Sequence, residues 1–155
     1  MKRFVVICDG LRSLFNVGSV FRTSDGVGIE KVYLCGITGK PDTEKAERKI
    51  SKVALGAQNF VEWEYVKQSW RLVEKLKKER YQIVSLEQTS KSINYTDFKP
   101  KFPLALIIGN EGKGVKKSLL NRSDKIIEIP MRGQKESLNV SVAFGIVAYW
   151  IGEFK

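Results

Sequence analysis

Short apolar runs of strand length recur along the chain, and the segments between them carry apolar residues at helical spacing. The predicted strands are Phe4–Cys8, Lys31–Cys35, Phe60–Val66, Gln82–Leu86, Pro103–Ile108 and residues 126–129, the last ended by Pro130. The predicted helices are Val17 to Gly26 or Gly28 behind Asn16 as N-cap, Asp42–Val53, Ser69–Arg80, a short segment with Leu119 and Leu120, and Val140–Trp150. This alternation favours an α/β fold in which helices layer a largely parallel sheet.

The 155 residues fit one domain with a sizeable core, and no repeat or low-complexity tract divides them. The longest surface connection is predicted at Thr89–Lys101, which is polar and bounded by proline. The apolar run near the N-terminus is too short for a signal peptide, and no stretch approaches the roughly 20 apolar residues of a membrane span. We therefore expect a single-domain cytoplasmic protein without membrane contact.

Charge and composition narrow the possible chemistry. Lys and Arg number 27 against 17 Asp and Glu, which gives a net charge of +10 and favours a polyanionic partner such as nucleic acid. The chain has no histidine, and its two cysteines, Cys8 and Cys35, lie in or beside apolar runs where a thiol acts as a small hydrophobe. This composition excludes Ser-His-Asp and Cys-His catalysis and a Cys/His zinc site, so we expect no metal.

The segment from Ile126 to Trp150 predicts a pocket. A short strand leads through the polar loop 131–136 into a helix rich in small and apolar residues, with Ser137 and Asn139 at the junction. The first turn of a helix leaves backbone N–H groups free to bind a small polar ligand. The alternative is that Ser137 only caps a buried helix.

Two further loops follow predicted strands, one before Asn16 and one at Gly109–Gly114. Parallel sheets bind ligands at the edge where the carboxyl ends of their strands lie. The loop Gly109–Gly114 lacks the lysine of a phosphate-binding P-loop, and the glycines from Gly26 lack the spacing of a dinucleotide fingerprint. Glu111 lies among the glycines of the loop Gly109–Gly114. It is either a ligand-binding carboxylate or a solvated turn residue. Arg22, six residues after Asn16, suits a phosphate contact or a surface position over apolar neighbours.

Three segments of the chain, in this order, resemble the motifs of one enzyme family. They are NVGSVFRTSDGVGI from Asn16, LALIIGNEGKGV from Leu104 and IEIPMRGQKESLNVSVAFGIVAYW from Ile127. They are similar to the first, second and third motifs of the SpoU/TrmH branch of the SPOUT RNA methyltransferases. The resemblance extends over nearly the whole chain, and its third motif is the most specific.

The resemblance implies an α/β fold whose C-terminal segment forms a deep trefoil knot, an exception to the rarity of knots. It also implies a homodimer, with S-adenosylmethionine bound in the knot and helix 140–150 at the dimer interface. The cofactor would be held largely by backbone, and its apolar walls suit an adenine ring. By motif matching, the cofactor-binding positions are Leu86, Gly109, Ile129 and Leu138.

The implied reaction is methyl transfer to a ribose 2′-hydroxyl of tRNA or rRNA. The catalytic residues carried over are Asn16, Arg22, Glu111, Ser137 and Asn139. Arg22 is implicated in deprotonating the hydroxyl, yet arginine keeps its proton to a pKa above ~12, so we prefer that it positions the neighbouring phosphate. Two alternatives are methylation of a base nitrogen and an RNA-binding module without turnover.

An RNA substrate would account for the net positive charge of the chain. Two clusters are candidates for contacts to RNA phosphates: Lys45, Arg48, Lys49 and Lys52 in one segment, and Lys113, Lys116, Lys117 and Arg122 after the second motif. The family often has an additional N-terminal RNA-binding domain, which we expect to be absent because the first strand begins almost at residue 1.

Overall fold

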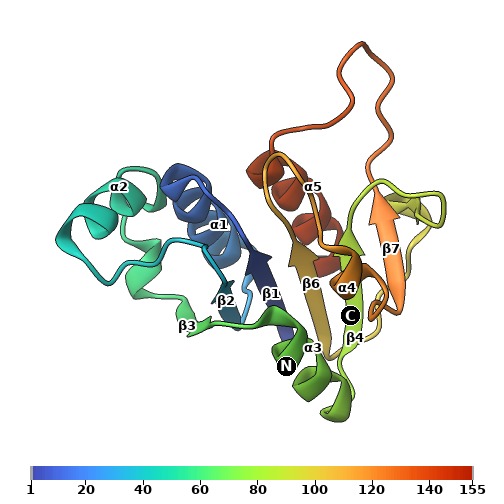
Figure 1. The fold of residues 1–155 in the computed structure, drawn as a ribbon, viewed down its shortest axis with the longest axis horizontal. Helices are drawn as coiled ribbons and strands as arrows, with labels where there is room; N and C mark the ends of the chain where they lie inside the picture. Colours follow the sequence, from blue (N-terminus) through green and yellow to red (C-terminus); the bar gives the residue numbers. More distant parts are fainter. Residues whose placement is uncertain (1, 155) are drawn as a thin grey trace.

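A seven-stranded sheet forms the centre of the protein (Figure 1). The computed structural model describes residues 2–154. The strands are β1 (Phe4–Asp9), β2 (Lys31–Cys35), β3 (Glu62–Val66), β4 (Gln82–Leu86), β5 (Ile93–Asn94), β6 (Leu104–Ile108) and β7 (Lys125–Glu128). Their order is β3-β2-β1-β6-β4-β7-β5, and every pair is parallel, which confirms the predicted α/β fold with a parallel sheet.

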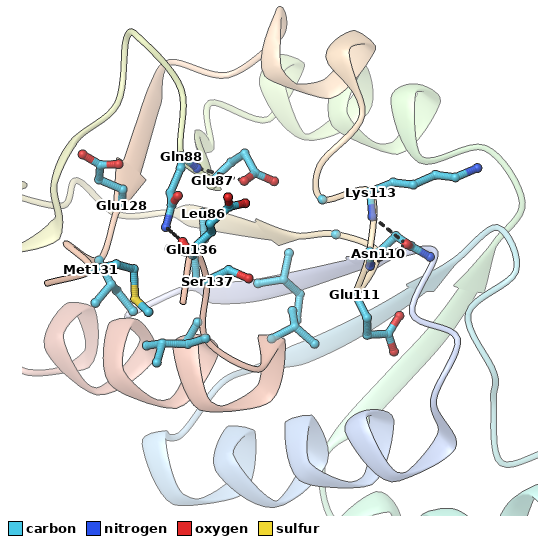
Figure 2. Close-up of a pocket in the computed structure, with 18 residues that line it drawn as sticks. Leu86, Glu87, Gln88, Asn110, Glu111, Lys113, Glu128, Met131, Glu136 and Ser137 are labelled. Carbon is cyan, nitrogen blue, oxygen red and sulfur yellow. Dashed lines mark hydrogen bonds between the residues drawn. The ribbon is translucent and has the colours of Figure 1, made fainter. Parts of the chain in front are cut away.

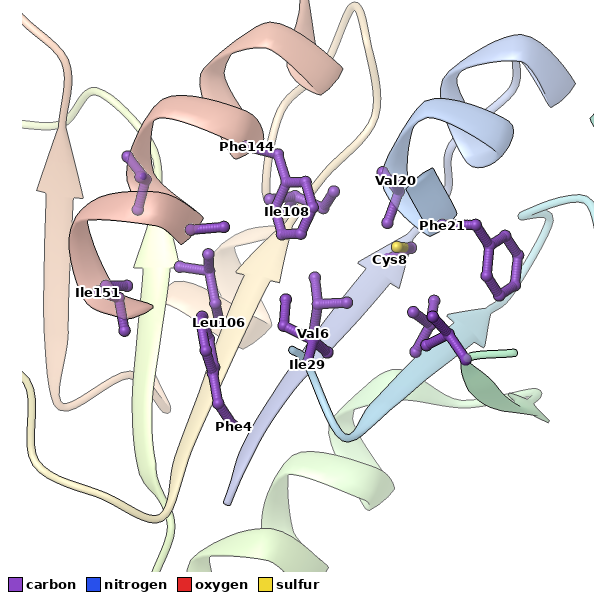
Figure 3. Close-up of a cluster of buried hydrophobic side chains, with 14 of the residues drawn as sticks. Phe4, Val6, Cys8, Val20, Phe21, Ile29, Leu106, Ile108, Phe144 and Ile151 are labelled. Carbon is purple, nitrogen blue, oxygen red and sulfur yellow. The ribbon is translucent and has the colours of Figure 1, made fainter. Parts of the chain in front are cut away.

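Helices cover both faces of this sheet. Three helices lie on one face and two on the other: α1 (Leu14–Val27), α2 (Glu44–Ala54) and α5 (Val140–Gly152) against α3 (Ser69–Lys78) and α4 (Lys117–Leu120). Because both faces are buried, the central strands are apolar throughout, as in β6. Figure 3 shows the core on the α1–α5 face, where Phe4, Val6 and Cys8 of β1 meet Phe144 of α5.

The pleat separates the two cysteines. Cys8 belongs to the core on the α1–α5 face, and Cys35 belongs to the core on the α3–α4 face. Both thiols are free and fully buried. Burial raises the pKa of Cys8 and raises the pKa of Cys35 to about 12, so both remain protonated. These side chains therefore act as small hydrophobes of the core, as the sequence predicts.

Two local predictions were wrong. The N-cap of α1 is Ser13, whose hydroxyl accepts from the backbone N–H of Asn16 at 3.2 Å, so Asn16 lies inside the first turn. The stretch Thr89–Lys101 is more than a surface connection, because it contains β5 and the short 3₁₀ turn Tyr95–Asp97. β5 forms by pairing with β7, and Phe98 holds the end of the stretch against the core, because its side chain is buried and its carbonyl accepts from the indole of Trp150 in α5.

The C-terminal third of the chain adds strands between earlier strands of the sheet. β6 lies between β1 and β4, and β7 then lies between β4 and β5, so both late strands insert beside earlier ones. Residues 129–139 project beyond the carboxyl ends of the strands before the chain returns to α5 (Figure 1). The trefoil knot itself stays a prediction. Within residues 2–154, no helix has the length and apolarity to cross a bilayer.

The contact between α1 and α2 depends on a glycine. A Cβ at Gly18 would lie 2.5 Å from the carbonyl oxygen of Ile50 and 3.1 Å from the Cβ of Val53. We expect Gly18→Ala to lower the free energy of unfolding by about 1–3 kcal/mol, because the helices must separate. Urea unfolding followed by circular dichroism measures this. Gly133→Ala is the control, since a Cβ there meets nothing within 4 Å. Equal stabilities of the two variants would contradict the prediction.

Candidate functional site

The carboxyl ends of β1, β6 and β7 bring the three motifs together at one edge of the sheet. The loop after β1 leads into α1, the loop after β6 carries Glu111, and the segment after β7 leads into α5. Parallel strands place their following loops on the same side, so segments distant in sequence meet there.

Glu111 connects two of these loops. Its Oε1 accepts from the backbone N–H of Arg12 at 2.8 Å, and its Oε2 accepts from the N–H of Ser13 at 2.9 Å and from Nδ2 of Asn16 at 3.0 Å. The Nδ2 of Asn139 in turn donates to Oδ1 of Asn16 at 3.4 Å. Three of the five predicted catalytic residues, Asn16, Glu111 and Asn139, therefore form one hydrogen-bonded chain.

These hydrogen bonds set the charge of Glu111. Partial burial of the carboxylate raises its pKa, but the donors from Arg12, Ser13 and Asn16 together outweigh burial and lower the pKa below its ordinary value. Glu111 is therefore an anion at neutral pH and a weak proton acceptor. Its geometry suits holding the start of α1 in place more than abstracting a proton.

The glycine loop around Glu111 is closed by its own backbone. Asn110 and Gly114 exchange backbone hydrogen bonds at 3.2 and 2.9 Å, and Oδ1 of Asn110 accepts from the N–H groups of Gly112 and Lys113. A Cβ at Gly109 would overlap the backbone of Gly114. Asn110 was missed by the sequence reasoning, although asparagine favours turns because its side chain can accept from backbone N–H groups two or three residues on.

A cavity of about 290 Å³ lies beside this loop (Figure 2). All four predicted cofactor-binding residues line it, together with two of the predicted catalytic residues: Leu86, Gly109, Ile129 and Leu138, with Glu111 and Ser137. The sequence reasoning missed Glu87, whose Oε2 accepts from the N–H of Val115 at 2.8 Å and so joins the end of β4 to the glycine loop.

The charged side chains of the cavity are mostly acidic. Its lining residues include four glutamates and one lysine: Glu87, Glu111, Glu128 and Glu136, with Lys113. Leu86, Ile129 and Leu138 add apolar walls. An acidic cavity with apolar walls attracts a ligand that joins a positive charge to a flat apolar ring.

Ser137 and Arg22 stand apart from the hydrogen-bonded chain. Ser137 lines the cavity, and the alternative that it caps α5 is wrong, because Oδ1 of Asn139 accepts from the N–H of Ser141 at 2.9 Å. Arg22 is exposed on α1 and has no acidic partner within residues 2–154. It lies on the same face of α1 as Phe15, seven residues earlier.

The chain matches one protein family over most of its length. The SpoU rRNA Methylase family matches residues 3–149. The tRNA (guanosine(18)-2′-O)-methyltransferase of Aquifex aeolicus is 33% identical over 152 residues, which cover 96% of this chain and 68% of that protein. A putative TrmH family tRNA/rRNA methyltransferase of Staphylococcus haemolyticus is 33% identical over 94% of this chain, which spans only 56% of that protein.

Solved structures agree with these relatives. The TrmH/SpoU tRNA modifying enzyme of A. aeolicus superposes with a TM-score of 0.87 at 30% identity, over 98% of this chain and 75% of that one. The SpoU methyltransferase AviRb of Streptomyces viridochromogenes, solved with AdoMet, shares the fold, with a TM-score of 0.85 at 23% identity over 98% of this chain and 60% of that one. The family inferred from the three motifs is confirmed, and the chain belongs to the SpoU rRNA methylase family.

Proposed function

We propose that the protein transfers the methyl group of S-adenosylmethionine to a ribose 2′-hydroxyl of tRNA or rRNA. The observation that carries the proposal is the hydrogen-bonded chain from Glu111 through Asn16 to Asn139 at the rim of an acidic, apolar-walled cavity. The name of the A. aeolicus relative, a tRNA 2′-O-methyltransferase, supports the same reaction.

The lining of the cavity suits S-adenosylmethionine in polarity and charge. When bound, the cofactor supplies a methyl group on a positively charged sulfonium. The excess of glutamates over lysine among the lining residues favours that positive charge, and the apolar side chains of Leu86, Ile129 and Leu138 suit its adenine ring. The close approach of Gly109 to Gly114 leaves backbone groups at the cavity wall that no side chain covers.

Arg22 would act on the RNA. A guanidinium binds phosphate oxygens through paired N–H donors, so Arg22 can fix the phosphate beside the target ribose and polarise the 2′-hydroxyl. Positioning of this kind lowers the barrier because the hydroxyl and the methyl group are held in line. Glu111 keeps Asn16 and the start of α1 in the orientation that this requires.

A homodimer would complete the site. Val142, Ile146 and Tyr149 form an exposed apolar stripe on α5, with exposed fractions of 52%, 37% and 50%, and Phe15 on α1 is 49% exposed. An apolar face of this kind is typical of a subunit interface. Because Arg22 shares a helix face with Phe15, a partner docked on this stripe would lie beside Arg22, and we propose that Arg22 serves the cavity of that partner.

The reaction is tested by incubating the protein with methyl-labelled S-adenosylmethionine and separately with tRNA and rRNA, then digesting to nucleosides. Label in a 2′-O-methylnucleoside is the expected result. Label on a base would replace the proposal by base methylation. Absence of label with either RNA, together with retained RNA affinity, would replace it by a binding module without turnover.

We expect Arg22→Ala to lower the rate of methyl transfer by roughly 100-fold, because the phosphate is no longer positioned. Affinity for S-adenosylmethionine, measured by calorimetry, stays unchanged. Arg22→Lys is the matched control: it keeps the charge without the planar fork, so we expect an intermediate rate. Loss of cofactor affinity in Arg22→Ala would contradict this role.

The position of Arg22 predicts complementation between subunits. Arg22→Ala has an intact cavity, and Leu138→Asp has a damaged cavity with an intact Arg22. If Arg22 serves the partner's cavity, mixed dimers of these inactive variants regain activity, because one of their two sites is complete. Methyl transfer by the co-expressed, doubly tagged dimer measures this. Activity no higher than that of either parent would show that Arg22 serves its own cavity.

The proposed interface predicts that a charged substitution on the α5 stripe halves the mass of the protein in solution. We expect Ile146→Asp to give a monomer in sedimentation analysis, because a carboxylate would be buried at the centre of the apolar stripe. Phe60→Asp is the matched control: Phe60 is 80% exposed but follows α2 and is not part of the stripe on α5, so this variant stays dimeric. A dimeric Ile146→Asp protein would place the interface elsewhere.

The lowered pKa of Glu111 predicts a pH dependence of stability. A group with a lowered folded pKa stabilises the fold above its unfolded pKa, and this contribution disappears as pH falls through the folded value. Wild type should exceed Glu111→Gln by about 1 kcal/mol near neutral pH, a modest value because the residue is exposed. The difference should vanish in acid. Urea unfolding at several pH values measures it, and a constant difference would contradict the assignment.

A further inference from the structure

The face of the sheet opposite α1, α2 and α5 carries a positively charged surface. We call it the Trp70 surface, and it consists of Trp70 and Arg71 on α3, Lys113 in the glycine loop, Lys117 on α4 and Arg122 after α4. Arg71, Lys113 and Lys117 have no acidic partner among residues 2–154. Unpaired cations on one surface favour an anionic partner.

Trp70 is the centre of this surface. Its side chain stays accessible, with an exposed fraction of 40%, and the guanidinium carbons of Arg71 and Arg122 lie 5.3 and 5.4 Å from its ring centroid. Glu74 fixes Arg122 through a 2.8 Å hydrogen bond to Nε. An accessible indole beside ordered guanidinium groups is the combination with which proteins bind single-stranded nucleic acid.

Part of the Trp70 surface follows the site directly along the chain. Lys113 stands two residues after Glu111, and its side chain extends away from the cavity in Figure 2. Lys117 begins α4, and α4 packs on α3, where Lys77 donates to the carbonyl of Arg122. The cations therefore form a path from the rim of the cavity to Trp70.

The proposed dimer leaves this path free, because its apolar stripe belongs to the opposite face of the sheet. The other basic cluster, on α2, is less suited. One of its cations, Arg48, is paired with Glu44 at 3.2 Å, and α2 lies on the face that carries α1 and α5.

We propose that the Trp70 surface binds the substrate RNA strand beside the target nucleotide. Arg71, Lys113 and Lys117 contact successive phosphates, and Trp70 stacks on a base or ribose outside the cavity. The inference rests on the proposed function for the identity of the partner. RNA affinity, however, is measured without turnover, so it can fail or succeed independently of methyl transfer.

The test compares Trp70→Ala and the double variant Arg71→Ala/Lys117→Ala with wild type. The probe is the RNA that wild type methylates, or total tRNA if wild type methylates neither RNA. We expect Trp70→Ala to weaken RNA binding about fivefold or more, the loss of one stacked base, and Trp70→Phe to recover most of it. In the double variant the slope of log affinity against log salt should fall by about 1.4, or about 0.7 per lost phosphate contact.

The matched controls are Phe60→Ala, which removes a more exposed aromatic ring, and Lys45→Ala/Lys49→Ala, which removes two cations from α2. We expect both to bind RNA nearly as wild type does, and all variants to keep their cofactor affinity. Unchanged affinity and salt slope in the Trp70 and Arg71/Lys117 variants would overturn the inference, as would an equal loss in the controls. Absence of methyl transfer by wild type would overturn the proposed function alone.

Discussion

The carboxylate of Glu111 is the contact on which the site depends. It joins the loop after β6 to the start of α1, although Arg12 and Glu111 are 99 residues apart in sequence. Two backbone donors and the Asn16 amide converge on it, and Asn16 reaches on to Asn139 at the start of α5. One anion thereby sets the relative positions of three segments. The lowered pKa of Glu111 keeps its carboxylate charged at neutral pH.

Most of the fold could be read from the sequence because the central strands are buried on both faces. Their apolar runs are continuous, and Lys31–Cys35 and Gln82–Leu86 match the observed strands. The wrong predictions concern contacts that periodicity does not encode. The cap at Ser13 depends on which hydroxyl reaches a free N–H, and β5 depends on pairing with β7, a strand that comes late in the chain.

The site was less predictable than the fold. The motifs identified Asn16, Glu111 and Asn139, yet their hydrogen bonds arise only when parallel strands bring three loops to one edge. Glu87 lies outside the three motifs, and Asn110 lies inside the second motif without a charge that points to a ligand. Both act through backbone, Glu87 by holding Val115 and Asn110 by closing the glycine loop. Such roles depend on loop geometry, which one sequence does not specify.

The two faces of the sheet differ in the chemistry of their exposed side chains, and they therefore favour different partners. The α1–α5 face exposes apolar side chains, which favour an apolar partner, whereas the Trp70 surface exposes three cations without an acidic partner among residues 2–154, which favour an anionic one. Arg22 differs from the other cations because it shares the apolar face with Phe15. In the proposed dimer, a cation beside the subunit interface would be shielded from solvent and salt and would bind one phosphate strongly. The exposed cations of the Trp70 surface bind several phosphates weakly, which suits a substrate that must leave after each turnover.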